Sequence, residues 1–246
     1  KPEVAKPEVA KPEVAKPDTE ADKQVESFRS REITSTSKLG GGINGSYKVT
    51  LLDGTEAVWK PSGEEAVEGM RDGIEKGTTY HREAAAYSVA TIIGMKDMVP
   101  MTIEREVDGE VGSLQKWVAN STVAFSASDP YDGRKGLARA AAFDYLMGNT
   151  DRHEGNWMVS TKGKLVLIDH GLSLSTVSGG VSSYLIARAQ WSAVSIPREV
   201  ASWDEGKIRT TLESHKIEPE AIDNAMERLK ELKSNVGSRY TWIQLV

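Results

Sequence analysis

The sequence predicts an α+β fold with two lobes and a cleft between them, a strand-rich first lobe and a mostly helical second one. Up to about residue 118, apolar residues run in short β-prone stretches that two Asp-Gly pairs interrupt. From about residue 134 onward, they recur mainly at helical spacing. A β-rich half followed by a helical half predicts two packed lobes rather than one mixed sheet.

Composition limits the function classes. The chain has 246 residues, 39% of them hydrophobic and 27% charged, which is typical of a globular protein and excludes a wholly disordered or collagen-like chain. No apolar run approaches the roughly 20 residues that a membrane span needs, so we expect no integral membrane contact and a cytoplasmic location. Without cysteine there is no disulfide, thiol nucleophile or thiolate metal site. The net charge of −5 argues against a nucleic-acid partner.

The N-terminal segment repeats the pentapeptide Lys-Pro-Glu-Val-Ala three times over residues 1–15. A proline at every fifth residue blocks both helix and sheet, and alternating Lys and Glu keep the segment hydrated. We therefore expect residues 1–27 to form an extended or disordered tether that links the globular part to another domain. The first residue is Lys rather than Met, and we expect the chain to be processed or cut from a longer polypeptide.

The expected N-lobe covers residues 28–118. Residues 32–60 predict β structure, with a hairpin turn at Asp53-Gly54. Apolar residues at helical spacing predict a helix over 78–94, with Gly94 as its C-terminal stop. Two further strands, 99–107 and 111–118, flank a second Asp-Gly turn, so the order is β-β-β-α-β-β.

The expected C-lobe covers residues 119–246. An Ala-rich apolar stretch predicts a helix over 134–147, and a hairpin with strands 157–160 and 164–168 follows a polar loop. Residues 204–215 and 219–233 carry helical periodicity.

The polar loop 148–156 carries the chemistry. Phosphoryl transfer needs a carboxylate that orients the attacking hydroxyl, oxygen ligands for a metal ion, and a lysine on the phosphates. Asp151 is followed five positions later by Asn156, and Asp169 comes thirteen residues after Asn156, at the end of the next hairpin. An amide and a carboxylate oxygen suit Mg²⁺, with Mn²⁺ as a possible replacement.

The N-lobe supplies the remaining parts. Lys60 ends a β run, and Glu83 lies in the first turns of the following helix. A strand lysine paired with a helix glutamate is the arrangement that aims an ammonium at the phosphates of ATP. A glycine-rich turn precedes this sheet, where a phosphate-covering loop belongs. Its candidate nucleotide-binding residues are Gly41, Gly42, Asn44, Gly45 and Ser46.

The motifs Asp-Arg-His-x-x-Asn at 151–156 and Ile-Asp-His-Gly at 168–171 resemble the phosphatidylinositol 3-/4-kinase-like superfamily, which also holds the HipA and Fam20 kinases. Residues 58–61, 79–87, 99–100 and 112–118 resemble its small bacterial branch. The resemblance implies a two-lobed protein-kinase-like fold that binds ATP and Mg²⁺ in the cleft.

The resemblance also implies roles for the residues that match its motifs. Asp151 would be the catalytic base, assisted by His153, and Asn156 and Asp169 would be the metal ligands. Lys60 would hold phosphates, with Glu83 orienting it. The strand that ends in Gln115, Lys116, Trp117 and Val118 would be the hinge whose backbone contacts adenine.

We therefore expect an ATP-dependent kinase that phosphorylates a hydroxyl, with Ser or Thr of a protein substrate as the preferred acceptor and autophosphorylation within 173–183. A small-molecule or lipid acceptor, a nucleotide-holding pseudokinase and AMP transfer stay open as alternatives. A zinc hydrolase that uses His153 and His170 is disfavoured, because these residues lie 17 positions apart, far from the short spacing that zinc sites prefer.

Overall fold

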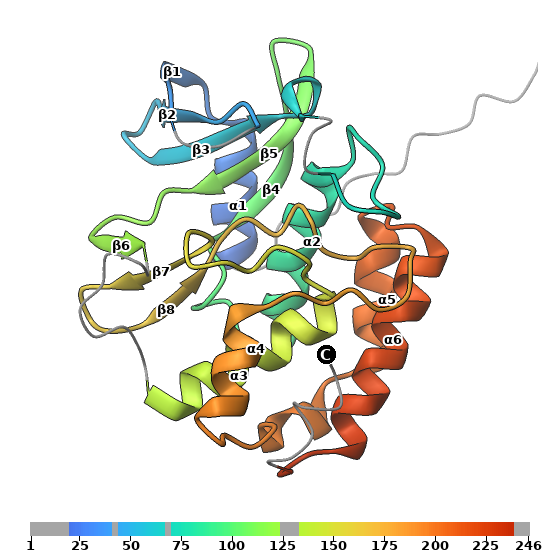
Figure 1. The fold of residues 1–246 in the computed structure, drawn as a ribbon. Coiled ribbons are helices and arrows are strands. Elements are labelled where there is room, and N and C mark those ends of the chain that lie inside the picture. Colours follow the sequence, from blue (N-terminus) through green and yellow to red (C-terminus); the bar gives the residue numbers. More distant parts are fainter. Residues whose placement is uncertain (1–19, 41–43, 67–69, 124–132, 239–246) are drawn as a thin grey trace, which may run out of the picture. The chain divides into compact units, whose positions relative to one another are not determined.

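The computed structural model (Figure 1) describes residues 20–40, 44–66, 70–123 and 133–238. Contacts within the chain group the described residues from Glu32 onward into one compact unit, distinct from the segment that ends at Arg31. Because this unit is not divided further, the lobe boundary at residue 118 remains a prediction. A β-rich N-terminal region followed by a helical region is confirmed.

The segment before the compact unit contains helix α1 (Glu20–Ser30). This corrects the expectation that residues 1–27 form an extended or disordered tether throughout. No proline or glycine occurs between Pro17 and Gly40, so nothing blocks a helix once the proline repeats have ended. The repeats themselves lie outside the described residues.

A five-stranded antiparallel sheet begins the compact unit, in the order β1-β2-β3-β5-β4. Its strands are β1 (Ile33–Lys38), β2 (Tyr47–Leu51), β3 (Glu56–Pro61), β4 (Thr102–Val107) and β5 (Glu110–Lys116). Both Asp-Gly turns form as predicted. Gly54 has φ +82°, and Asp108 and Gly109 have φ +53° and +83°, the left-handed pair that a two-residue hairpin turn requires.

Helix α2 (Thr79–Ile92) contacts β4 and β5 of this sheet. Its alanines at 84–86 are fully buried, which allows close packing. The Glu65 carboxylate accepts hydrogen bonds from the amides of Gly77 (2.6 Å) and Thr79 (3.1 Å), so a side chain from the preceding loop caps the helix. Gly94, with φ +79°, ends the helix as predicted.

In the described part of the chain, the remaining elements are a three-stranded sheet, four α-helices and two short 3₁₀ helices. They are η1 (Ser62–Glu64), β6 (Ser121–Val123), α3 (Gly133–Met147), β7 (Trp157–Ser160), β8 (Leu165–Leu167), α4 (Tyr184–Trp191), η3 (Arg198–Ser202), α5 (Glu205–Ser214) and α6 (Pro219–Ser234). The sequence did not predict β6, which has only three residues, or α4, which begins in a Ser-rich stretch at the N-cap Ser183.

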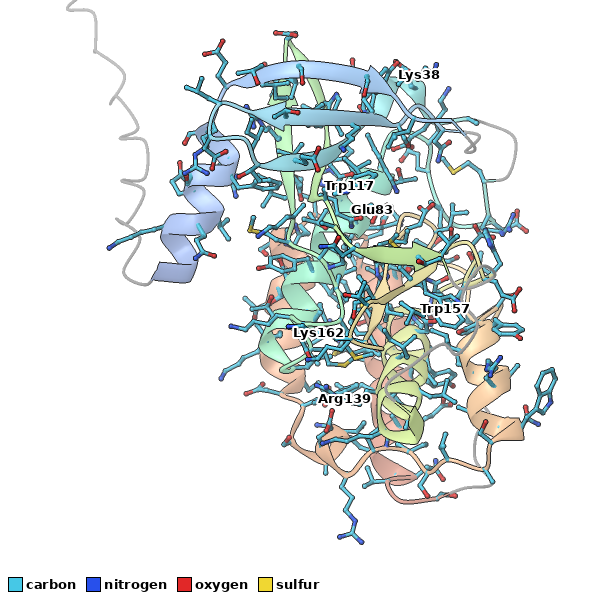
Figure 2. All side chains as sticks on the ribbon, turned by 90° about the vertical axis from the view of Figure 1, so that its left-hand side faces the viewer. Lys38, Glu83, Trp117, Arg139, Trp157 and Lys162 are labelled. Atoms are coloured by element: carbon cyan, nitrogen blue, oxygen red, sulfur yellow. The ribbon has the colours of Figure 1, made fainter. Side chains whose placement is uncertain are left out.

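One hydrophobic core joins α2 to the C-terminal helices, so the helix that carries Glu83 is packed on both halves of the compact unit. Figure 2 shows Glu83 and Trp117 below the five-stranded sheet, where this sheet meets the helical part. None of the helices in the described part of the chain is both long and apolar enough to cross a lipid bilayer.

Candidate active site

Lys60 stands at the centre of a charged cluster that links three elements. Alternation along β3 buries the side chains of Ala57 and Trp59 on one face, so Lys60 points to the other. Its Nζ lies 2.6 Å from Glu83 Oε1 on α2 and 3.2 Å from Asp169 Oδ1 after β8. The structure thus brings together three predicted site residues from distant parts of the sequence.

The two carboxylates decide the charge state of Lys60. Burial alone would lower its pKa, but Asp169 and Glu83 outweigh burial and raise the pKa above its ordinary value. The ammonium in turn lowers the pKa of Asp169, against the opposing effect of burial. The cluster therefore keeps a fixed positive charge and an ionised carboxylate at neutral pH, which is the state that phosphate and metal binding require.

Asp151 lies in the loop after α3, and each of its carboxylate oxygens has a neighbour. Oδ1 is 3.1 Å from Nη2 of Arg71, and Oδ2 is 3.3 Å from Nδ2 of Asn156. His153 Nε2 lies 3.9 Å from Oδ2, which is too far for a hydrogen bond. The His153 ring is 62% exposed, and its Nδ1 accepts a hydrogen bond from the amide of Gly155.

Asn156 is oriented by the same loop. Its Nδ2 donates to the Asp151 carbonyl at 2.9 Å, so Oδ1 is the amide atom left for a cation. The amide of Ile168 donates to the Asn156 carbonyl at 3.1 Å, which brings the next residue, Asp169, alongside the loop. This set of amide and carboxylate oxygens fits a hard divalent cation such as Mg²⁺ or Mn²⁺.

Arg152 holds the loop 148–156 to its surroundings. It is 1% exposed, and its Nε donates to both carboxylate oxygens of Asp144 on α3, at 3.2 and 3.1 Å. Its Nη1 donates to the carbonyls of Asn156 and Ile168. One guanidinium therefore fixes the backbone at Asn156 and next to Asp169, the two proposed metal ligands.

His170 is a packing residue that supports this network. Arg152 Nη2 lies 3.1 Å from His170 Nδ1, and because arginine can only donate, Nδ1 accepts and the proton sits on Nε2. Burial and the neighbouring guanidinium hold the pKa of His170 well below its usual value, so the ring is neutral. Its amide also donates to Glu83 Oε2 at 3.1 Å. His170 is therefore unavailable to the metal of a zinc hydrolase.

The glycine-rich turn is described only in part. Gly41 and Gly42 lie outside the described residues. Gly45 packs so closely on Glu64 that any added Cβ would overlap its side chain, and its amide donates to the Glu64 carbonyl at 3.1 Å. Asn44 Oδ1 accepts from the amide of Ala66 at 2.8 Å, and the Ser46 carbonyl accepts from Leu39. The bonds of Gly45 and Asn44 tie the described end of the turn to the segment after β3, and the bond of Ser46 joins it to the residue after β1.

The predicted hinge residues lie at the end of β5 and just after it, and the amides of Lys116 and Trp117 already donate to backbone carbonyls. The Lys116 amide donates to Met101 at 2.8 Å, and the Trp117 amide donates to Glu56 at 3.0 Å. The Gln115 side chain donates from Nε2 to Thr102 Oγ1 at 2.9 Å. A nucleotide therefore cannot take an amide hydrogen from Lys116 or Trp117 without breaking the sheet.

Sequence reasoning missed three residues of the site. Arg152 belongs to the motif, but the sequence alone assigns it no role. Asp144 is an isolated acidic residue within the apolar run of α3, and such a residue signals a buried charged partner. Arg71, which contacts Asp151, lies in the loop between β3 and α2. No local pattern marks it, because its partner is 80 residues away.

Sequence comparison confirms the resemblance to the superfamily. Residues 104–183 match the sequence model of the family phosphatidylinositol 3- and 4-kinase. Protein Rv2133c of Mycobacterium tuberculosis is 30% identical in a match that covers 58% of this chain and 64% of that protein. Phosphatidylinositol 4-kinase gamma 4 of Oryza sativa subsp. japonica is 29% identical, over 48% of this chain and 26% of that protein. The chain spans less than two thirds of either relative.

Comparison with solved structures confirms the two-lobed protein-kinase-like fold. Fam20 of hydra, solved with sugar, has a TM-score of 0.63 at 13% identity, and the match covers 89% of each chain. The Golgi casein kinase with Mn and ADP bound has a TM-score of 0.59 at 13% identity, covering 89% of this chain and 76% of that one.

Proposed function

We propose that this chain is an ATP-dependent kinase that transfers the γ-phosphoryl group to a hydroxyl. The observation that carries the proposal is the position of Lys60 Nζ, 2.6 Å from Glu83 and 3.2 Å from Asp169. This arrangement joins a strand lysine, a helix glutamate and a candidate metal ligand, as phosphoryl transfer from ATP requires. The family match at 104–183 supports it, because this segment contains Asp151, Asn156 and Asp169.

Each site residue has a role in the proposed reaction. Asp151 accepts the proton of the acceptor hydroxyl as the acceptor oxygen bonds to phosphorus, and the bond from phosphorus to the β,γ-bridging oxygen breaks as ADP leaves. Lys60 holds the phosphates, and Glu83 holds Lys60. Asn156 and Asp169 are suited to bind the divalent cation, which would neutralise charge on the phosphates. His153 remains a proposed assisting residue of the same loop.

We favour a protein Ser or Thr as the acceptor. The segment that follows the Asp-His-Gly motif, residues 172–183, contains no Lys or Arg to bind an inositol phosphate. Autophosphorylation in this region is restricted by burial. Ser173 and Ser175 are buried, and the Ser183 hydroxyl donates to Asp144 at 2.7 Å, whereas Ser178 and Ser182 are exposed. The exposed pair is therefore the proposed position for autophosphorylation.

A lipid acceptor is the second candidate. The family match and the rice relative favour it, since both carry the name of phosphatidylinositol kinases. Transfer of label from γ-labelled ATP separates the two acceptors, because the label enters either protein or an extracted lipid.

The test compares turnover of labelled Mg-ATP by wild type, Asp151→Ala and Asp169→Ala. Asp223→Ala is the control, because Asp223 is an exposed carboxylate that lies 2.9 Å from Arg209, away from the site. We expect both site variants to lose at least 100-fold in turnover, and the control to keep it. Wild-type turnover in either site variant would remove the proposed mechanism. ATP binding without turnover on any acceptor would favour a pseudokinase.

A further inference from the structure

Arg71 is a charged side chain in direct contact with the proposed catalytic base, Asp151. Its Nη2 lies 3.1 Å from Asp151 Oδ1, and its side chain is 42% exposed. It precedes α2 and falls outside the segment 104–183 that matches the kinase family. An exposed ion pair contributes little to stability, so a contact at this position calls for a functional explanation.

The backbone that carries Arg71 is firmly held. The Ile74 amide donates to the Arg71 carbonyl at 3.1 Å and closes a turn in which Gly73 has φ +74°. The Asp72 carbonyl accepts from Ser175 Oγ at 2.7 Å, and the Gly73 carbonyl accepts from the amide of Thr176 at 3.0 Å. This turn is thus fixed to the segment that follows Asp169.

Gly73 shows how close that contact is. A Cβ at this position would lie 2.5 Å from Ser175 Oγ and 2.7 Å from the amide nitrogen of Val177. The left-handed backbone also disfavours any other residue there. With the turn fixed, a change in the position of the guanidinium comes from rotation of the Arg71 side chain alone.

The place of Arg71 relative to Asp151 defines what it can bind. An acceptor hydroxyl must lie within hydrogen-bond distance of Asp151, roughly 2.6–3.2 Å, and the phosphorus lies about 3–3.5 Å from the acceptor oxygen. A guanidinium that already contacts Asp151 is therefore within one side-chain rotation of the transferring group. Its five N–H donors match a phosphate group better than an ammonium does.

We propose that Arg71 binds the terminal phosphate of the nucleoside triphosphate, and that its ion pair with Asp151 is the position it takes before that phosphate arrives. The inference rests on the proposed kinase function and adds to it a nucleotide-binding residue. When Arg71 turns to the phosphate, Asp151 Oδ1 becomes available to the acceptor hydroxyl. The enzyme thereby distinguishes ATP from ADP before the acceptor is engaged.

Calorimetric titration tests this without knowledge of the acceptor. ADP and the non-hydrolysable analogue AMP-PNP, each with Mg²⁺, are titrated into wild type, Arg71→Gln and Arg71→Lys. Arg209→Gln is the matched control, because Arg209 is 41% exposed and lies 2.9 Å from Asp223, away from the site. We expect Arg71→Gln to keep its ADP affinity and lose about tenfold in preference for the triphosphate, with Arg71→Lys intermediate and the control unchanged.

The outcomes separate the inference from the function. A wild-type preference retained in Arg71→Gln overturns the inference and leaves the kinase proposal standing, as does equal binding of both nucleotides by wild type. No binding of either nucleotide by wild type overturns the kinase proposal and the inference together. If Arg71→Gln also loses affinity for ADP, the result with Arg71→Lys decides. A preference for the triphosphate as strong as that of wild type in Arg71→Lys would contradict recognition by the guanidinium group.

Discussion

Glu83 illustrates at the residue scale how one side chain can serve two parts of a site. Its Oε1 pairs with Lys60 at 2.6 Å, and its Oε2 accepts the amide hydrogen of His170 at 3.1 Å. The carboxylate is nearly buried, with 3% of its side chain exposed. It therefore fixes both Lys60, the proposed phosphate-binding residue, and the backbone beside the candidate metal ligand Asp169.

Replacement of this carboxylate by an amide tests the arrangement. Glu83→Gln keeps the shape and one hydrogen-bond acceptor but removes the charge that holds the ammonium. We expect kcat/KM for ATP to fall about 100-fold while the protein stays folded. Steady-state kinetics with circular dichroism measures both, and Glu106→Gln, an exposed glutamate on β4, is the control. Unchanged kinetics in Glu83→Gln would show that the Glu83 carboxylate is not needed to position Lys60, which also lies 3.2 Å from Asp169.

Glu104 is a second carboxylate with an unusual setting, outside the site. Its Oε2 lies 3.0 Å from His81 Nδ1 and its Oε1 2.7 Å from His215 Nδ1, while His215 Nε2 lies 2.8 Å from Ser88 Oγ. Burial would raise the pKa of Glu104, but hydrogen bonds and charge from the two imidazoles outweigh burial and lower the pKa to about 2. The cluster connects β4, α2 and the end of α5.

This shift predicts a dependence of stability on pH. A lowered pKa means that ionised Glu104 stabilises the fold above its ordinary pKa of 4.5, and that this stabilisation is lost as pH falls towards about 2. We expect Glu104→Gln to lower the free energy of unfolding by roughly 2 kcal/mol at pH 7, allowing for solvent screening, and by much less at pH 2.5. Urea unfolding at both pH values, with Glu106→Gln as control, measures the difference. An equal loss at both pH values would contradict the assignment.

At the scale of elements, α2 is held from two directions by neighbouring residues. Glu83 meets the sheet through Lys60, whereas Arg82 meets the C-terminal half: its Nη2 lies 2.9 and 2.8 Å from the two carboxylate oxygens of Glu218, the N-cap of α6. Arg82 Nε also donates to the Ser173 carbonyl at 3.0 Å. The orientation of α2, and so of Glu83, depends on both contacts.

The connection between α3 and the loop 148–156 depends on the buried pair of Asp144 and Arg152, both with 0% of the side chain exposed. We expect Asp144→Ala to cost about 3–5 kcal/mol in the free energy of unfolding, because Arg152 is left buried without its partner. Asp223→Ala removes the partner of the exposed Arg209 and should cost less than about 1 kcal/mol. Chemical unfolding of both variants measures the contrast, and similar losses would mean that the buried network is not what holds the loop.

At the scale of the whole molecule, the proposed cleft residues come from both halves of the compact unit. A ligand that binds Lys60, Asn156 and Asp169 together should therefore stabilise the folded state as a whole. At 100 times its dissociation constant, ADP with Mg²⁺ should contribute about 2.7 kcal/mol, which corresponds to roughly 5–10 °C in melting temperature for a protein of this size. The measurement is thermal unfolding with ADP and Mg²⁺ and again with ADP and excess EDTA. A shift that EDTA leaves intact would contradict metal-assisted binding.

Local patterns in the sequence predicted much of the fold. The two Asp-Gly turns, the stop of α2 at Gly94, the hairpin of β7 and β8, and the helices near 134–147, 204–215 and 219–233 all form. One local prediction was wrong: α1 forms where an extended tether was expected. The proline repeats end at Pro17, and the residues that follow contain nothing that blocks a helix. The short strand β6 and helix α4 had too weak a periodicity to be recognised.

By itself the sequence determined the turns and the order of the candidate site residues. Turn preferences and the number of positions that separate Asp151, Asn156 and Asp169 are properties of the local chain. Only the tertiary structure decided their partners: Lys60 with both Glu83 and Asp169, Asp144 with Arg152, and Arg71 with Asp151. The physical reason is that these charges are compensated across contacts that packing alone creates. Burial makes such pairing necessary for Glu83, Asp144 and Arg152, and a linear pattern does not show which partner packing will supply.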